Sequence, residues 1–529
     1  MPPIARRGTV AAIAAAVPVV FLGVFFAWPL LATVRRAVLG GGQDGAGVSA
    51  RSVVDAAGTT LWLAGAGTAL TLAVGLPAAW ALYRRRWPGS RVIAAALTAP
   101  FVLPTVVVAL AFLTLQRDLL PALGARHGLP AIVAALAFFN VAVVLRTVGP
   151  ALEGLDERLV AAARTLGASP AQAARRVIWP AVRRSVGGAA AITFLFCSTS
   201  FAIVLVLGGT RIQTLETAAY LELTAFFDLR SAALIALIQA CLVAAVAAGV
   251  SVMTRAPARA ATQAAPMRPH ARRANVAAIA VAVAPALTLV LLPIAALVHR
   301  SVRVGSTYTL DAYRNLFGTG ASALRDSVVT SLWIALAAAI TAFAVAAAAV
   351  IAAALHPRAR WVRALTVGPL AVSSVVVGVG LLVALAVPMR SWGDAGTYAL
   401  LVAAQALVAT PLVVRILAPA LDSLDPRQSA AAATLGASPF QAMWHVVIPR
   451  LRPAIASAFG LAFAVAIGEF GASVFLARPG TPTLPTAIVR LLGRPGAENV
   501  ATASAGAVVL AVLAGGVMMA VEGRRRNSR

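Results

Sequence analysis

The sequence predicts an all-α polytopic membrane protein with about twelve transmembrane helices, arranged as two tandem domains of six helices each. The first observation is composition: 60% of the 529 residues are hydrophobic and only 12% are charged, whereas soluble domains are roughly 45–50% apolar. The second is that the apolar residues occur in runs of about 20, the length that spans a bilayer as a helix. The third is a long internal repeat, which divides the chain into two similar halves.

Twelve apolar runs are long enough to cross a membrane. Each run is expected to be a helix, because an open strand would leave its backbone polar groups without partners in hydrocarbon. The runs lie at residues 9–34, 57–83, 92–115, 129–149, 185–208, 231–253, 275–298, 327–354, 362–387, 397–418, 454–477 and 499–521. The first run is longer than the roughly 7–15 apolar residues of a signal peptide, so we expect it to be a retained helix.

The arginine positions predict the orientation. A net charge of +27 would suggest a nucleic-acid partner if it stood alone. All 44 basic residues are arginines, however, and most lie in short breaks between apolar runs. If the spans alternate from a cytoplasmic N-terminus, about two thirds of the arginines face the cytoplasm, in agreement with the positive-inside rule. We therefore expect a multi-pass protein of the bacterial plasma (inner) membrane with both termini in the cytoplasm, and no nucleic-acid partner.

The two halves are related by sequence. Residues 150–180 align without gaps to residues 419–449, and the same offset of 269 residues takes Leu166 onto Leu435. Because each half holds an even number of spans, the repeats share one orientation, and a substrate path between them is expected. We predict a first domain at 1–253, a cytoplasmic linker rich in Pro, Ala and Arg at 254–274, and a second domain at 275–529.

The most similar part of the repeat is a cytoplasmic segment, AAARTLGASP at 161–170 and AAAATLGASP at 430–439, in which nine of ten positions are identical. Gly167 suits a left-handed C-terminal turn, while Ser169 and Pro170 suit the start of a second helix. We predict a helix, a turn and a second helix that present small alanines and a leucine to a partner, with Pro180 and Pro449 marking re-entry into the next span. The alternative is a solvated loop whose likeness is left over from duplication.

This segment resembles the cytoplasmic loop of type I ABC importer permeases, which reads E-A-A, three residues, G, nine residues, I-x-L-P. The family's leading Glu is Ala161 and Ala430 here, and its late Leu is Trp179 in the first copy. The resemblance therefore implies docking to an ATPase by shape rather than through an ion pair from that glutamate. The residues that it assigns to ATPase coupling are Ala161, Ala162, Ala163, Leu166, Gly167 and Pro180 in loop 150–180, and Ala430, Ala431, Ala432, Leu435, Gly436 and Pro449 in loop 419–449.

The resemblance covers nearly the whole chain and implies a permease subunit that forms a translocation pathway. Its expected partners are a separate ABC ATPase subunit, in two copies, an extracellular or periplasmic substrate-binding protein and the lipid bilayer. The chain contains no lysine and hence no P-loop of the form GxxxxGK[ST]. We therefore expect no enzymatic activity, no catalytic residue, no cofactor and no metal site in this chain.

The resemblance narrows to the fused permeases of ferric-iron and thiamine importers. The stretch from Ser200 to Gln239 is most similar to thiamine and thiamine-phosphate members, whereas the stretch from Ile467 to Ile488 is found in similar form in both groups. Thiamine is the favoured substrate and ferric iron the open alternative. Specificity is expected to come largely from the external binding protein.

Polar residues within spans are candidates for the pathway, because an ionisable group in a membrane is costly. Glu469 is the acidic residue deepest in a span and is matched by Ser200 in the first half. It is suited to attracting a cationic substrate; the alternatives are a hydrogen bond between helices or a position near the outer mouth. Asn140 and Gln405 are further pathway candidates, and Gln239 is a weaker one, although buried amides more often bridge helices.

Other residues suggest structure rather than chemistry. Pro100, Pro104 and Pro369 interrupt the third and ninth spans, where broken helices line a cavity or kink. His445 is interpreted as a surface imidazole. Cys197 and Cys241 lie in apolar runs without metal-ligand spacing, so core packing is expected for both.

Three other classes of protein compete with this interpretation. A secondary transporter can also have twelve spans and a parallel repeat, but it does not need the cytoplasmic motif twice. A membrane enzyme is disfavoured because no HExxH or GxSxG motif is present. A channel is disfavoured by the unequal polarity of the two halves.

Overall fold

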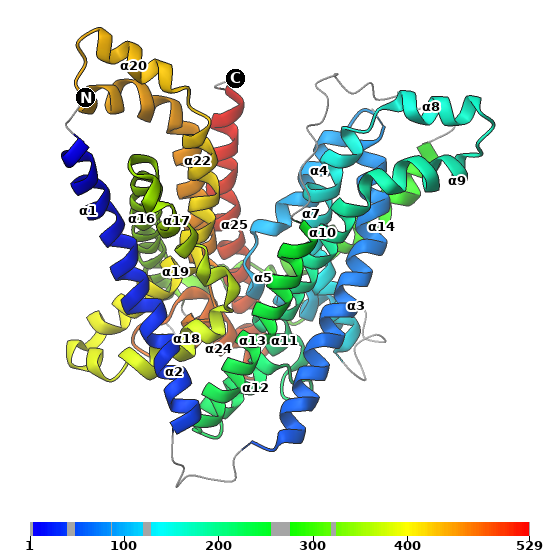
Figure 1. Ribbon diagram of the computed structural model, residues 1–529. Coiled ribbons are helices and arrows are strands. Elements are labelled where there is room, and N and C mark those ends of the chain that lie inside the picture. Colours follow the sequence, from blue (N-terminus) through cyan, green and yellow to red (C-terminus); the bar gives the residue numbers. More distant parts are fainter. Residues whose placement is uncertain are drawn as a thin grey trace. The chain divides into compact units, whose positions relative to one another are not determined.

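The computed structural model describes residues 4–39, 48–85, 87–119, 128–254, 276–318 and 324–527, and nearly all of them are helical (Figure 1). Within this part of the chain the β-structure is a short antiparallel hairpin, β1 (Arg303–Val304) and β2 (Thr307–Tyr308). The predicted linker lies outside the described residues, apart from Thr254. An all-α polytopic membrane fold is confirmed.

The helices of the first half run from the N-terminus to the linker. They are α1 (Ile4–Leu22), η1 (Gly23–Ala27), α2 (Trp28–Leu39), α3 (Ala50–Tyr83), α4 (Ser90–Thr98), η2 (Ala99–Val102), α5 (Thr105–Thr114), η3 (Leu115–Leu119), α7 (Leu129–Glu153), α8 (Glu157–Thr165), α9 (Pro170–Ala173), η4 (Ala174–Ile178), α10 (Trp179–Ser198), α11 (Phe201–Gly208), α12 (Leu215–Thr224) and α13 (Leu229–Thr254).

The helices of the second half follow the same order. They are α14 (Val276–Ser301), α15 (Asp311–Phe317), α16 (Arg325–Leu355), η6 (Pro357–Ala359), α17 (Arg360–Leu365), η7 (Gly368–Ala371), α18 (Ser374–Leu385), η8 (Pro388–Trp392), α19 (Gly393–Asp422), α20 (Pro426–Thr434), α21 (Pro439–Ala442), η9 (Met443–Val447), α22 (Ile448–Ile467), α23 (Ser473–Leu476), α24 (Leu484–Leu492) and α25 (Ala497–Asn527).

The number of spans agrees with the sequence prediction. Among the described residues, nine helices are long and apolar enough to cross a membrane, and three bent helix pairs bring the number to twelve. The third and ninth spans bend by 107° and 99°, beside Pro100 and Pro104 in one case and Pro369 in the other. Proline lacks a backbone N–H and disfavours helix in the residue before it, so the breaks form there. A further bend of 54° separates α10 from α11.

Hydrogen bonds at one pair of equivalent helices reflect the duplication. In the first half, the Leu215 backbone N–H at the start of α12 donates to Thr60 Oγ1 on α3 at 3.0 Å. In the second half, the Leu484 N–H at the start of α24 donates to Ser331 Oγ on α16 at 2.6 Å. Each short helix therefore begins on a hydroxyl of the corresponding long helix.

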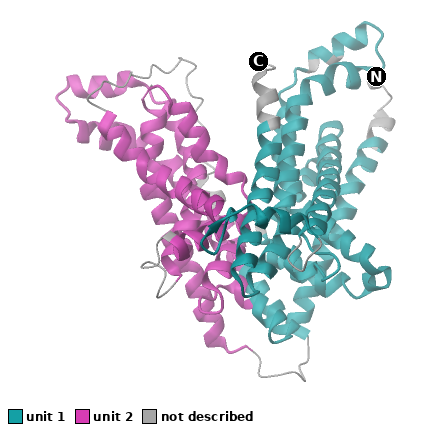
Figure 2. Cartoon of the chain, turned by 180° about the vertical axis from the view of Figure 1, so that it is seen from behind, with its two compact units in different colours: residues 1–47, 219–240, 301–529 teal, residues 48–218, 241–300 magenta. Residues whose placement is uncertain are grey.

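The compact units of the structure divide the chain differently from the sequence repeat (Figure 2). Unit 1 comprises Met1–Gly47, Ala219–Ala240 and Ser301–Arg529, and unit 2 comprises Val48–Ala218 and Cys241–Arg300. Thus α1 and α2 belong to the unit built mainly from the second half, whereas α14 belongs to the unit built mainly from the first. The first span of each repeat packs with the other repeat's helices.

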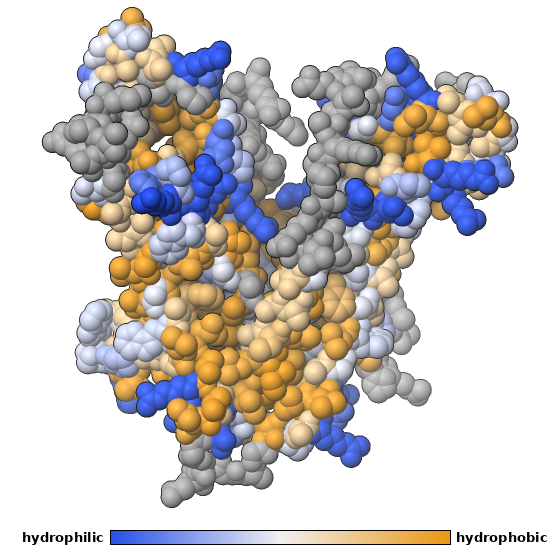
Figure 3. Space-filling view, in the orientation of Figure 1, coloured by the Kyte–Doolittle hydropathy of each residue, from blue (hydrophilic) through white to orange (hydrophobic). Residues whose placement is uncertain are grey.

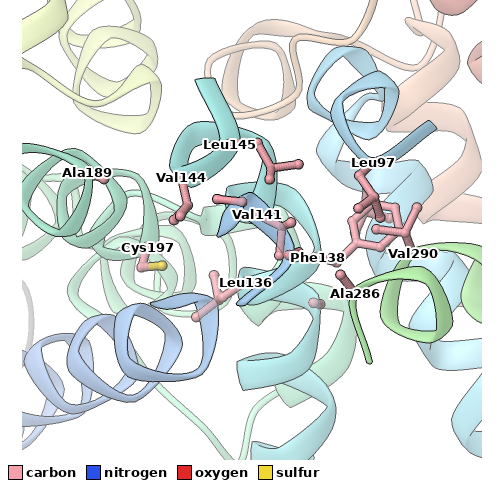
Figure 4. Packing of buried hydrophobic residues seen from close by; sticks show 14 of the residues in the cluster. Leu97, Leu136, Phe138, Val141, Val144, Leu145, Ala189, Cys197, Ala286 and Val290 are labelled. Atoms are coloured by element: carbon pink, nitrogen blue, oxygen red, sulfur yellow. The ribbon is translucent and has the colours of Figure 1, made fainter. Parts of the chain in front are cut away.

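Core contacts explain why the first span of each repeat packs in the unit built mainly from the other repeat. In unit 2, Ala286 and Val290 of α14 join a buried cluster that includes Leu97 and Phe138 (Figure 4). In unit 1, Leu22 at the end of α1 packs in the cluster of Leu381 and its neighbours. In a soluble protein, burying a large apolar side chain contributes about 1.5–3 kcal/mol. In lipid, close packing of such side chains stabilises each unit.

The outward helix faces are apolar, as a lipid solvent requires. On α1, Ala11 and Leu22 are buried, whereas Val10, Ile13 and Val20 are more than half exposed. Figure 3 shows apolar side chains over the helix shafts, while hydrophilic side chains gather near the ends of the helices. This distribution suits helices surrounded by hydrocarbon and ending at polar interfaces.

Candidate functional site

The duplicated segment of the first half folds as a helical hairpin, α8–α9, which projects beyond the ends of α7 and α10 (Figure 1). Asp156 caps α8 by accepting a hydrogen bond from the Arg158 N–H at 2.9 Å. Ser169 and Gln172 form a reciprocal capping box at the start of α9, with bonds of 2.9 and 3.2 Å. These caps satisfy backbone donors that a short helix leaves open. The hairpin is thus a defined structure built from its own sequence.

The turn between α8 and α9 depends on Gly167, which has a φ of +83°. The Ala168 N–H donates to the Ala163 carbonyl at 3.0 Å, and the Gly167 N–H donates to the Arg164 carbonyl at 3.1 Å. This pair of bonds is the Schellman motif that ends many helices. The left-handed turn predicted at Gly167 is therefore present.

The second hairpin, α20–α21, repeats this geometry in unit 1. Asp425 caps α20 through the Arg427 N–H at 2.9 Å, and Gly436 has a φ of +86°. The Ala437 N–H donates to the Ala432 carbonyl at 3.0 Å, and Ser438 and Gln441 form the corresponding capping pair. Two separate parts of the chain therefore build one shape.

Each hairpin carries an almost fully exposed leucine at its turn. Leu166 is 89% exposed and Leu435 is 88% exposed. Ala161, Ala162, Ala430 and Ala431 are also exposed, whereas Ala163 and Ala432 are half-buried. Both hairpins thus hold a large apolar side chain outward at the same point of the same turn.

The second helix of each hairpin runs without a break into the next span. A π-helical turn, η4 in the first half and η9 in the second, joins α9 to α10 and α21 to α22. In each, one N–H reaches five residues back: Trp179 to the Ala174 carbonyl, and Ile448 to Met443. Pro180 and Pro449 follow directly and have no N–H, so the wider turn accommodates them within a continuous helix. The second helix of each hairpin is therefore continuous with a span.

Arg84 fixes the first hairpin to the membrane-spanning part of unit 2. It lies at the C-terminal end of α3, with its side chain only 7% exposed. Its guanidinium donates to the Leu155 carbonyl at 3.1 Å and pairs with the Glu157 carboxylate at 2.9 Å. Burial lowers the pKa of Arg84, and the Glu157 charge partly offsets that effect. The side chain stays protonated, because arginine does not lose its proton in proteins.

The second half has a more exposed ion pair, which joins α17 to α19 and does not include the hairpin α20–α21. Arg363 of α17 pairs with Asp422 at the end of α19 at 2.9 Å, and the two side chains are 37% and 57% exposed. Exposed ion pairs contribute about 0–1 kcal/mol, because water screens them. Sequence reasoning overlooked Arg84, since one more arginine in a cytoplasmic break is explained by membrane topology alone.

Ser200 and Glu469 occupy equivalent helix breaks. Ser200 lies between α10 and α11, and its Oγ donates to the Phe196 carbonyl at 2.6 Å. Glu469 is buried between α22 and α23, where its carboxylate accepts from the Ala472 N–H at 2.7 Å. It also accepts from the Ser473 N–H at 3.0 Å and from the Ser473 Oγ at 2.7 Å. Both carboxylate oxygens of Glu469 thus accept hydrogen bonds from the start of α23.

The predicted polar residues contact neighbouring helices. Asn140 of α7 donates to the Leu136 carbonyl at 2.8 Å and to Cys197 of α10 at 3.5 Å. Gln405 of α19 donates to Ser473 Oγ at 3.5 Å, so Gln405, Ser473 and Glu469 form one chain within unit 1. Gln239 is buried in α13. The structure joins Glu469 to Gln405 in unit 1, whereas Ser200 and Asn140 belong to unit 2.

The other predicted residues have no evident chemical role. His445 is exposed on η9, and its Nδ1 lies 3.0 Å from the Gln441 carbonyl oxygen. Cys197 is buried, whereas Cys241 is exposed, so core packing fits only the first. In the described part of the chain, no group of three His, Cys, Asp or Glu side chains is placed to hold a metal.

Comparison with known proteins supports the repeat. The family described as "Binding-protein-dependent transport system inner membrane component" matches the chain twice, at residues 71–304 and 345–522. The two matches cover most of the chain and confirm that one kind of domain is duplicated.

The chain is similar over its length to a curated permease. It is 28% identical to the thiamine transport system permease protein ThiP of Brucella abortus (strain 2308) over 540 residues, which covers 97% of this chain and 96% of that protein. It is 28% identical to the probable ABC transporter permease protein y4fN of Sinorhizobium fredii, over 64% of this chain and 62% of that protein. It is 31% identical to the putative 2-aminoethylphosphonate transport system permease protein PhnV of Salmonella paratyphi A, over 31% of this chain and 60% of that protein.

Proposed function

Because this chain belongs to the family of binding-protein-dependent transport system inner membrane components, which are permease subunits of ABC importers, we propose that it imports thiamine or a thiamine phosphate. The observation that carries the substrate proposal is the similarity to a thiamine permease over 97% of the chain. The sequence from Ser200 to Gln239 supports the same substrate. Ferric iron and 2-aminoethylphosphonate are the alternative substrates against which the thiamine proposal is tested.

Coupling to an ATPase is the second part of the proposal. Two hairpins with the same capped geometry, each exposing a leucine, suit a partner that offers the same groove twice. We assign the docking surface to Ala161, Leu166 and Gly167 with their neighbours, and to Ala430, Leu435 and Gly436 with theirs. The continuous helices behind both hairpins would transmit a displacement from the partner to a span. The predicted domains, 1–253 and 275–529, would then act as two permease repeats.

Thiamine uptake tests the substrate. A strain that lacks its own thiamine importer would express this chain with its ATPase and binding-protein partners, and radiolabelled thiamine, ferric iron and 2-aminoethylphosphonate would be supplied separately. Accumulation of thiamine that is competed by unlabelled thiamine is expected. Uptake of iron or of the phosphonate, with no uptake of thiamine, would show that thiamine is not the substrate. The assignment as a permease would remain.

ATP turnover is expected only in the assembled importer. The isolated chain has no P-loop, because it has no lysine to contact the phosphates. The purified chain should therefore hydrolyse no ATP, and turnover should appear when the ATPase subunit is added in a detergent or nanodisc preparation. Turnover that copurifies with the chain after every ATPase subunit has been removed would contradict this division of labour.

Thiol labelling tests the proposed orientation. Arg164→Cys on the first hairpin and Arg51→Cys near the start of α3 both place a cysteine at an exposed position. After Cys197 and Cys241 are replaced by serine, an impermeant thiol reagent should label position 51 in intact cells. It should label position 164 only after the membrane is opened. The reverse pattern would place the hairpins outside the cell and exclude a cytoplasmic ATPase as their partner.

A further inference from the structure

Three phenylalanines of unit 2 form an aromatic cluster at the break in the third span. Phe101 lies in η2, Phe139 in α7 and Phe196 in α10. The Phe101 ring centroid is 5.3 Å from that of Phe139 and 6.1 Å from that of Phe196, with interplanar angles of 32° and 52°. All three side chains are half-buried, so part of the aromatic surface is uncovered within its own unit.

A positive charge already lies on this surface. The Arg146 guanidinium of α7 is 5.3 Å from the Phe101 ring centroid. An arginine near the end of a membrane span normally extends toward the membrane surface, because a charge in hydrocarbon is costly. Here the exposed Arg146 side chain lies over the ring of Phe101 at the helix break. The aromatic surface therefore fits a water-accessible face better than a lipid-facing one, and it accommodates a cation.

The repeat indicates that packing alone does not require these rings. The offset of 269 residues takes Phe101, Phe139 and Phe196 onto Leu370, Val408 and Val465. Those three aliphatic side chains are also half-buried, and Arg146 corresponds to the equally exposed Arg415. The same fold is thus built once with aromatic and once with aliphatic residues on one surface. The stability of the fold therefore does not explain why the first half has aromatic side chains at these positions.

We propose that Phe101, Phe139 and Phe196 form a stacking surface for an aromatic cation during its passage, with Arg146 as the resident cation that the substrate displaces. This inference rests on the proposed import of thiamine, which has two flat rings, one of them positively charged. Stacking of rings and attraction of a cation to ring faces suit such a molecule. A site of this kind binds weakly, as a transport pathway needs for release.

The test replaces the three phenylalanines of the first half with the residues found at the equivalent positions of the second half. The variant Phe101→Leu, Phe139→Val, Phe196→Val contains only side chains that the repeat already accommodates. We expect it to reduce initial thiamine uptake about tenfold, equivalent to about 1.4 kcal/mol, with a normal amount of protein in the membrane and normal copurification of the ATPase. The variant with tyrosine at all three positions keeps the rings and should stay within about twofold of the parent.

A matched control removes aromatic rings elsewhere. Phe343 and Phe459 are also half-buried and form a ring pair in unit 1 at 6.5 Å, and their replacement by leucine should leave uptake unchanged. Normal uptake in the aliphatic triple variant, or an equal loss in the control, would overturn the inference while leaving thiamine import intact. If the triple variant does not reach the membrane, Phe139→Leu and Phe139→Tyr make the same comparison, and equal uptake by the two would overturn it. A parent that imports no thiamine refutes the proposed substrate and this inference together.

Discussion

Replacing Gly167 with valine is expected to reduce substrate uptake at least about tenfold while the protein remains in the membrane. Gly167 has a φ of +83°, and an added Cβ would meet no atom within 4 Å. The effect is therefore conformational and not a clash. A β-branched residue in this region is a strong outlier, and such strain costs about 1–3 kcal/mol. The turn would open, and Leu166 would no longer be held outward.

Asparagine provides the matched control for this substitution. Asparagine adopts positive φ far more readily than valine, so Gly167→Asn should keep uptake within about twofold of the parent. Gly436→Val should reproduce the effect of Gly167→Val, because Gly436 has a φ of +86° in the same motif. The double variant should be little worse than either single one, since parts that act as a unit are not additive. Uptake, membrane abundance and ATPase copurification would be measured together, and normal uptake in both valine variants would refute the coupling role.

The spans and hairpins were predictable because the signals that specify them are local. A run of about 20 apolar residues has few alternatives to a membrane helix. The turn at Gly167 follows from a glycine placed between a helical stretch and Ser169–Pro170. The repeat doubled the evidence, because the same residues recur at Gly436 and Ser438. Positions where the halves agree thus predicted the shared shape.

The remaining features depend on contacts between distant segments. Hydropathy gives the length of the first span but not its neighbours, so the packing of α1 with unit 1 could not be read from it. The fit of Pro180 into a continuous helix depends on a π-helical turn that no local motif announces. Phe101, Phe139 and Phe196 become a cluster only when three helices meet. Their signal was nevertheless present in the places where the halves differ, at Leu370, Val408 and Val465.

Loss of Arg84 is expected to loosen the first hairpin and lower uptake about tenfold. Arg84 binds both the Leu155 carbonyl and the Glu157 carboxylate, and thereby joins the end of α3 to the start of α8. A buried hydrogen bond to a charged group contributes about 1.5–3 kcal/mol. Glutamine at position 84 is shorter and uncharged, so it cannot make both contacts. The helix α8 would remain capped by Asp156 but would lose its fixed position relative to the spans.

Arg363→Gln is the control, because it breaks an ion pair between α17 and α19 in the second half without touching either hairpin. That pair with Asp422 is largely exposed and contributes at most about 1 kcal/mol, so uptake should fall less than about threefold. Hydrogen exchange should distinguish positioning from general destabilisation. In Arg84→Gln, the amides of α8 and of residues 154–156 should exchange faster, while those of α20 and of the core of unit 2 should not change. Equal uptake in the two variants would contradict the positioning role of Arg84. Faster exchange spread over all of unit 2 would show that Arg84 supports the fold as a whole. Faster exchange confined to the first hairpin, together with reduced uptake, would show that Arg84 acts by holding α8 in position relative to the spans.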